Sequence, residues 1–319
     1  MLKILTFVDI VVAWDPNTTQ EFLSMDQIMP PPPYNKLISL LGVHDALSQA
    51  SYKILTQIQR STSVEVRRIE NEMTMLLSAY KNKLGEAMRS TMEKIRTKSM
   101  EDGDDSSSPQ GSSDIHKVTR SVMTYIRFLC SNYSSVDAAI CGNEYVPHIE
   151  NIPSLHSMTI EMVSCLQEKL ANIAESFSDQ ALRFLFLLNN SYFIQEFQYF
   201  YCFKQPMLPV DFNHQIEDHM ERYLQVSWAP LLSCLSNSTS LCLGKNYSPL
   251  SKFESEFEKT YTTQKQWKVP DPELRRRLRE VITEKIIPDY KEYIEDIKAS
   301  NPKISPLELE VMLQELFEG

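Results

Sequence analysis

The chain has 319 residues, 42% hydrophobic and 23% charged, so it can bury a sizeable core and is not disordered overall. Its 7 glycines are about a third of the average share, which disfavours glycine-rich phosphate loops and hairpins and favours helices. The net charge of −10 argues against a nucleic-acid partner, because binding a polyanion requires clustered positive charge.

The first predicted helix covers the apolar run from Ile4 to Trp14. This run is too short to span a bilayer, Asp9 interrupts it, and no small-residue cleavage site follows it. We therefore interpret it as an amphipathic core helix rather than a membrane span or a secretion signal. Prolines 16 and 30–33 then mark turns around a short predicted helix from Gln20 to Met29.

A long helix follows, because apolar residues recur every three or four positions over some thirty residues: Ile69, Met73, Leu76, Tyr80, Leu84, Met88, Met92 and Ile95. We expect this stripe to pack in the core. Residues 99–114 are mostly acids and serines with little to bury, so we predict a disordered loop there. This loop is the only internal boundary that we expect, between first helical layers at 1–98 and carboxyl-terminal helical layers at 115–319.

Beyond the loop, helices are predicted from Val118 to Leu129, from Val163 to Phe177 and from Leu182 to Phe203. The last helix opens with Ser305, Pro306 and Glu308, which form a capping-box pattern. The whole chain therefore reads as all-α. Helices with short links and no sequence repeat fit either a compact bundle or an elongated stack of pairs, and the residues alone leave both open.

A helical hairpin is predicted from Phe253 to Pro288. Trp267 lies at the break and is expected to be largely buried there. Asp271 can cap the second helix, and Pro272 fits its first position. The second helix carries an apolar stripe at Leu278, Ile282, Ile286, Tyr290, Tyr293 and Ile297.

We find no motif of a catalytic centre, so the sequence predicts no enzyme, no cofactor and no metal site. His214 and His219 are five apart and face different sides of a helix, which makes them poor joint metal ligands. The carboxylate pair Glu254 and Glu258 is expected on a solvated helix face. The six cysteines form no Cys-x-x-Cys pair, as is usual for reduced thiols of a cytosolic protein.

Several segments, taken in order, resemble the exocyst subunit family called Exo-seventy in its plant form. The strongest is the turn Gln266–Asp271 with Phe253, Phe257, Leu274–Arg275, Leu278–Arg279, Ile287–Pro288 and Tyr290. The others are Leu5–Asp9, Gly85–Arg89, Thr119–Ile126, Ala181–Asn190, Ser227–Trp228 and the closing Glu315–Gly319. The similarity covers nearly the whole chain.

The resemblance implies an elongated rod of stacked antiparallel helix pairs that lacks the long coiled amino-terminal portion of the family. It also implies a non-enzymatic tethering subunit that links secretory vesicles to the plasma membrane in exocytosis, through other exocyst subunits and anionic phosphoinositides. Such a protein would be cytoplasmic and peripheral at the plasma membrane and on vesicles. The alternative is a helical adaptor that presents an apolar pocket to an immune protein or a pathogen effector, as some plant members do in plant immunity.

The resemblance directs attention to basic residues near the carboxyl terminus as a lipid site. From Asp271 to Lys303, however, eight cations face eight acids. Since Arg275 and Arg279 belong to the family signature and could serve packing, the better lipid-binding candidates are Arg276, Arg277, Lys298 and Lys303. We expect weak phosphoinositide binding, because neighbouring acids cancel the basic residues.

The aromatic run from Tyr192 to Phe203 departs from the family, in which this segment soon becomes polar. The partner-binding candidates are Phe197, Phe200, Tyr201 and Phe203. Apolar surface outside the core tends to mark an interaction site. The alternative is that neighbouring helices simply bury these rings.

Overall fold

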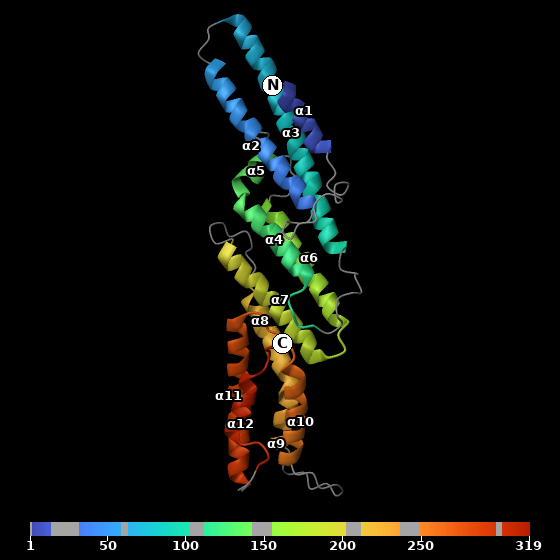
Figure 1. Ribbon diagram of the computed structural model, residues 1–319, viewed down its shortest axis with the longest axis vertical. Coiled ribbons are helices and arrows are strands. Elements are labelled where there is room, and N and C mark those ends of the chain that lie inside the picture. The colour runs from blue at the N-terminus through green and yellow to red at the C-terminus, as the bar shows by residue number, and fades with distance from the viewer. Residues whose placement is uncertain are drawn as a thin grey trace. The chain divides into compact units, whose positions relative to one another are not determined.

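The computed structural model describes residues 2–13, 32–58, 63–101, 112–141, 155–201, 212–236, 249–297 and 302–319. In these ranges the backbone forms twelve α-helices and no strand, apart from one isolated antiparallel bridge between Lys268 and Glu318 (Figure 1). The predicted all-α class is therefore confirmed.

The helices are α1 (Leu2–Ala13), α2 (Pro32–Ile58), α3 (Val64–Glu101), α4 (Lys117–Ser131), α5 (Tyr133–Cys141), α6 (Leu155–Glu175), α7 (Gln180–Tyr201), α8 (Asn213–Ser227), α9 (Ala229–Ser236), α10 (Pro249–Gln264), α11 (Pro272–Asp296) and α12 (Pro306–Gln314). The predicted helix from Gln20 to Met29 lies outside the described residues.

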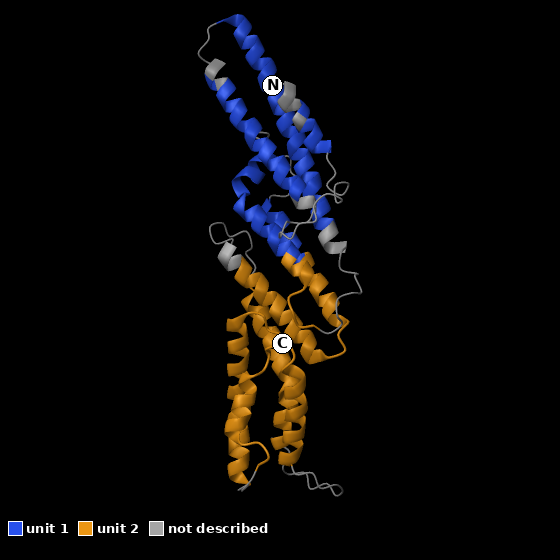
Figure 2. Cartoon of the chain, viewed as in Figure 1, with its two compact units in different colours: residues 1–104, 121–164 blue, residues 105–120, 165–319 orange. Residues whose placement is uncertain are grey.

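The chain divides into two compact units, one of residues 1–104 and 121–164 and the other of residues 105–120 and 165–319 (Figure 2). The loop predicted at 99–114 lies mostly outside the described residues. At its two ends, residues 99–101 belong to α3, and residues 112–114 make hydrogen bonds that are described below. The division into helical layers at this loop stays a prediction.

The first unit is built on the hairpin of α2 and α3, which pack against each other and against α1 and α5 (Figure 1). Its core contains Leu37, Leu40 and Leu47 of α2, Leu84, Met88, Met92 and Ile95 of α3, and Val136 and Ile140 of α5. Helix α3 crosses α5 closely at Gly85, where a Cβ atom would overlap the carbonyl oxygen of Ala139. Arg89 fixes the crossing by donating to the carbonyl of Ile140 at 2.6 Å.

The stripe predicted on α3 is buried only in its carboxyl-terminal half. Ile69 and Leu76 are 45% and 47% exposed, whereas Leu77 is the first buried residue of the helix. The expectation of a fully buried stripe was therefore wrong for the first three turns. Periodicity shows that a helix is amphipathic but not how far its neighbours extend along it.

The second unit has an aromatic core with a buried polar chain through it. Trp228, between α8 and α9, is fully buried and donates its indole N–H to the Tyr223 hydroxyl at 3.0 Å. That hydroxyl lies 2.5 Å from the amide oxygen of Gln264, and the Gln264 amide nitrogen donates to Ser227. The side chains of Trp228, Tyr223, Gln264 and Ser227 thus all have hydrogen-bond partners. This pairing allows them to be buried in the same core as Phe253 and Phe257.

Candidate functional site

The turn between α10 and α11 forms as predicted, but the two helices meet chiefly through the stacked rings of Phe253 and Tyr290, while α9 packs against both. Asp271 accepts hydrogen bonds from the N–H groups of Glu273 and Leu274, both at 2.9 Å, and Pro272 follows it at the first helical position. The stripe from Leu278 to Tyr290 is buried, whereas Ile297 is exposed. Trp267 is partly buried at the break, less deeply than the fully buried Trp228. The buried anchor next to the hairpin is Trp228.

The two signature arginines of α11 bind the carboxyl-terminal tail, which we define as Leu316–Gly319. Arg279 donates to the carbonyl of Leu316 through Nε at 3.0 Å and Nη2 at 2.5 Å, and to the Glu318 carboxylate at 2.5 Å. Arg275 lies 3.8 Å from the same carboxylate. The side chain of Arg279 is only 15% exposed. Both arginines therefore hold the tail against α11.

Each described lipid-binding candidate forms an ion pair with a carboxylate. Arg276 binds both Glu273 and Glu280 at 2.5 Å. The hydrogen bond with Arg276 lowers the pKa of Glu273. Both groups of such an ion pair keep their charges. A lipid headgroup phosphate would therefore have to compete with the glutamate carboxylates that already bind Arg276.

The other two described candidates are paired in the same way. Arg277 reaches Glu217 of α8 at 2.5 Å, and Lys303 reaches Glu258 of α10 at 2.9 Å. The fourth candidate, Lys298, lies outside the described residues. The structure therefore places three of the four predicted residues on α11 and the α11–α12 link, each beside an acid.

Lys303 is positioned by a buried carboxylate that the sequence did not reveal. Glu254 of α10 was expected on a solvated face, but it is buried and accepts the backbone N–H groups of Lys303 at 2.7 Å and Ile304 at 3.3 Å. The Tyr290 hydroxyl donates to the Ile304 carbonyl at 2.7 Å. These bonds tie the link between α11 and α12 to α10, and they explain why this carboxylate can be buried.

The described part of the aromatic run, from Tyr192 to Tyr201, lies on the second half of α7. The rings of Phe193 and Phe197 are 6.0 Å apart, and both side chains are partly buried. Burial, with the nearby Asp271 carboxylate, raises the pKa of Tyr192 to about 12. The side chains of Phe200 and Tyr201, and all of Phe203, lie outside the described residues. The predicted partner surface is thus described only at Phe197.

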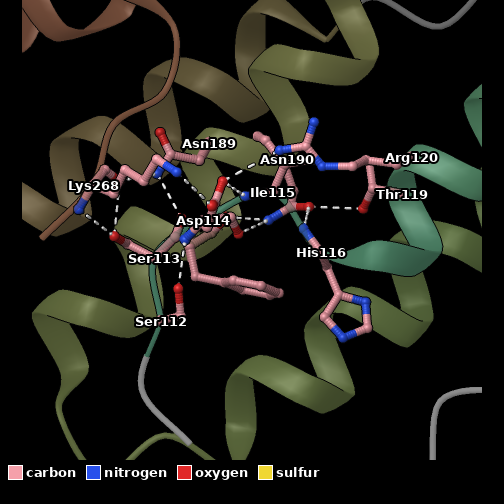
Figure 3. A network of polar contacts seen from close by, with 11 residues as sticks. Ser112, Ser113, Asp114, Ile115, His116, Thr119, Arg120, Asn189, Asn190 and Lys268 are labelled. Atoms are coloured by element: carbon pink, nitrogen blue, oxygen red, sulfur yellow. Dashed lines mark hydrogen bonds and ion pairs between the residues drawn. The ribbon is translucent and has the colours of Figure 1, made fainter. Parts of the chain in front are cut away.

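A polar junction that the sequence reasoning missed joins three distant segments of the second unit (Figure 3). We use the name strap for residues Ser112–His116, which lead into α4. Ser113 is buried, and its hydroxyl bonds both backbone groups of Lys268, the carbonyl at 2.8 Å and the N–H at 2.9 Å. The Asn189 amide nitrogen donates to the carbonyls of Ser113 at 2.7 Å and Lys268 at 3.0 Å.

Asn190 completes the junction on the side of α4. Its amide oxygen accepts the N–H of His116 at 3.0 Å and the hydroxyl of Thr119 at 2.7 Å. Burial opposes the charged form of Asp114, yet the Lys268 ammonium at 3.0 Å, the N–H of Ile115 and the Arg120 guanidinium together outweigh it and lower the pKa of this carboxyl. The available signal was the pair Asn189–Asn190 inside an apolar helix, because buried amides require specific partners.

The described part of the chain holds neither a metal cluster nor a membrane span. No group of three or more His, Cys, Asp or Glu side chains there could hold a metal ion. Within the same residues, no helix combines the length and the apolar character needed to cross a bilayer.

Comparison with known proteins identifies the family. The family model for the C-terminal region of the Exo70 subunit of the exocyst complex matches residues 17–315. The exocyst complex component EXO70A1 of Arabidopsis thaliana is 24% identical over 89% of this chain and 47% of its own length. Component EXO70A3 of the same plant is 29% identical over 64% of this chain and 38% of its own length. The chain thus spans about half the length of these relatives or less.

Solved structures show the same fold. Exo70 of S. cerevisiae has a TM-score of 0.52 at 16% identity, covering 99% of this chain and 69% of that one. A second exocyst Exo70p structure has a TM-score of 0.53 at 15% identity, covering 99% and 71%. Together with the match over residues 17–315, this likeness leads to one conclusion: the chain belongs to the Exo70 exocyst subunit family, and corresponds to its carboxyl-terminal part.

Proposed function

We propose that this protein acts as a non-enzymatic subunit of an exocyst-like tether in exocytosis. The observation that carries the proposal is the family match over residues 17–315, since the family is named as an exocyst complex subunit. The twelve packed helices of the described residues fit a protein that works by presenting surfaces.

The partners in this proposal are other exocyst subunits, and the protein works peripherally at the plasma membrane and on vesicles. Lipid contact is weak, because Arg276, Arg277 and Lys303 are exposed cations already paired with acids. Exposed ion pairs contribute little to stability. The acids in these pairs nevertheless cancel the local positive potential, which would otherwise draw this part of the protein to an anionic lipid surface.

The aromatic residues of α7 are the proposed contact surface for a protein partner. Phe197 is the described member, and its partly buried ring packs beside Phe193. If this surface binds a partner, Phe200→Asp abolishes that binding with little change in melting temperature. If the same substitution unfolds the protein, the rings belong to the core.

Co-purification tests the proposed function. The full-length protein is tagged, expressed at its native level, and purified beside a tagged helical protein of unrelated sequence as the control. We expect the other exocyst subunits to be recovered in near-equal amounts with the protein and not with the control. Recovery of a different protein without any exocyst subunit would favour the adaptor function instead.

A further inference from the structure

We propose that Lys268 couples the docking of two segments that are far apart in the sequence, the strap Ser112–His116 and the tail Leu316–Gly319. When one segment detaches, the other loosens. This conformational device goes beyond the tethering role and does not depend on it. It rests on the contacts that the two segments make with the turn between α10 and α11.

The strap occupies one side of Lys268. The N–H and the carbonyl of Lys268 both bond the hydroxyl of Ser113, at 2.9 and 2.8 Å. Asn189 adds a bond to the same carbonyl at 3.0 Å, and the Lys268 ammonium pairs with Asp114 at 3.0 Å. The Ser113 hydroxyl thus makes the two hydrogen bonds to Lys268 that the backbone of a neighbouring strand would make in a sheet (Figure 3).

The tail occupies the other side. Lys268 and Glu318 form the antiparallel bridge, and the N–H of Val269 donates to the carbonyl of Phe317 at 3.5 Å. A Cβ atom at Gly319 would lie 3.2 Å from the Lys268 side chain. In an extended segment, successive peptide groups point to opposite sides. Lys268 can therefore bond the strap while its neighbour bonds the tail, as the middle strand of a sheet does.

The tail is held in a conformation that it would not keep alone. Phe317 has φ 65°, which is uncommon for a residue other than glycine and unfavourable for a bulky one. The ring is fully buried and lies 6.2 Å from the Tyr223 ring, while Arg279 holds the carbonyl of Leu316. Such a conformation persists only where its surroundings impose it.

Coupling follows because both segments need the same extended backbone at Lys268. If the tail leaves, the turn loses one of its two sides and can bend, and the Ser113 hydroxyl can then no longer reach both groups of Lys268. The same argument holds in reverse when the strap leaves. A partner that captures either segment would therefore change the exposure of the other.

Hydrogen exchange of the whole chain, followed by mass spectrometry of its peptides, tests the coupling. Phe317→Ala detaches the tail, and we expect exchange to rise at least fivefold in the strap as well as in the tail. Leu307→Ala, at an exposed position of α12, is the control and leaves both unchanged. Asn189→Ala loosens the strap, and we expect faster exchange in the tail.

Arg279→Gln provides a milder release of the tail, since Phe317 keeps its ring, in case Phe317→Ala unfolds the unit. The peptide from α8 reports such unfolding. The coupling is refuted if the tail loosens in Arg279→Gln while the strap does not. It is equally refuted if the strap and α8 loosen to the same extent, because the junction would then be only one part of a uniform core.

Discussion

Two tryptophans near the carboxyl-terminal hairpin differ in what they contribute to stability. Trp228 is fully buried with its indole N–H bonded to Tyr223, whereas Trp267 is partly exposed at the turn. We expect Trp228→Ala to lower the free energy of unfolding by about 4 kcal/mol, because it leaves a large cavity and removes one of the two hydrogen bonds of the Tyr223 hydroxyl. Trp267→Ala should cost about 1–2 kcal/mol, since water can occupy part of the space. Urea unfolding measures both, and equal costs would contradict the assignment.

We expect a buried histidine to make the first unit sensitive to acid. His44 of α2 is buried, and the nearest acceptor to its Nδ1 is the Asp45 carboxylate at 3.7 Å, too far for a good hydrogen bond. Burial lowers the pKa of His44 below 6.5, and Lys81 contributes in the same direction, whereas Asp45 opposes it. Below pH 6.5 the unfolded chain therefore binds a proton that the folded chain resists.

The free energy of unfolding should consequently fall as the pH drops from about 7 to about 5. We expect His44→Gln to reduce this fall, because glutamine does not titrate. Urea unfolding at the two pH values measures the difference. If the variant and the original protein lose the same stability over this range, His44 is not the group responsible.

At the scale of single elements, local chemistry was predictable and tertiary burial was not. The caps at Asp271 and Ser305 follow from residues within three positions of each helix start, and both were confirmed. Ser113 was assigned to a disordered loop because its neighbours are acids and serines. Its actual environment depends on Lys268, which is 155 positions away.

The candidate site was predictable to a similar degree. The sequence identified Arg276, Arg277 and Lys303 as lipid-binding candidates, and the structure shows their side chains exposed, which leaves the lipid role itself a prediction. Local composition also showed that acids accompany them. It could not show that Glu217 and Glu258, on other helices, would supply two of the partners, because such pairing depends on how helices pack.

The crossing of α3 and α5 requires a glycine at position 85. A methyl group there would overlap the carbonyl oxygen of Ala139, which is backbone and cannot move aside. We expect Gly85→Ala to cost about 1–3 kcal/mol through overpacking. Gly42→Ala is the matched control, since Gly42 lies within α2 with no atom within 4 Å of the added methyl. It should gain about 0.5–1 kcal/mol from helix propensity.

Thermal unfolding distinguishes the two substitutions, because they have opposite signs. If Gly85→Ala is as stable as Gly42→Ala, the two helices do not approach as closely as described. That result would also remove the physical reason for a glycine at the start of the segment Gly85–Arg89. In that segment Arg89 holds the same helix crossing by donating to the carbonyl of Ile140.

For the molecule as a whole, we expect the balance of charge to limit binding to anionic vesicles. We expect it to sediment weakly with phosphoinositide vesicles at low salt and not at physiological salt, where exposed charges are screened within about 8 Å. Reversing the charges of Arg276, Arg277, Lys298 and Lys303 should abolish the weak binding.

Freeing the same cations should have the opposite effect. A variant with glutamine at Glu217, Glu258, Glu273 and Glu280 removes the acids that bind them. The control with glutamine at Glu284, Glu292, Glu295 and Glu310 changes the net charge equally. We expect tighter vesicle binding for the first variant only. Equal binding would show that net charge alone matters, and tight binding of the original protein at physiological salt would show a focused lipid site.

The most direct test of tethering through exocyst partners is the fraction of the full-length protein at the plasma membrane of living cells. It is measured by fluorescence after depletion of another exocyst subunit, and separately for the variant with the four reversed charges. If protein partners place the molecule, the fraction falls on depletion and stays near its original value in the variant. A fraction that survives depletion but is lost in the variant would contradict tethering through these partners.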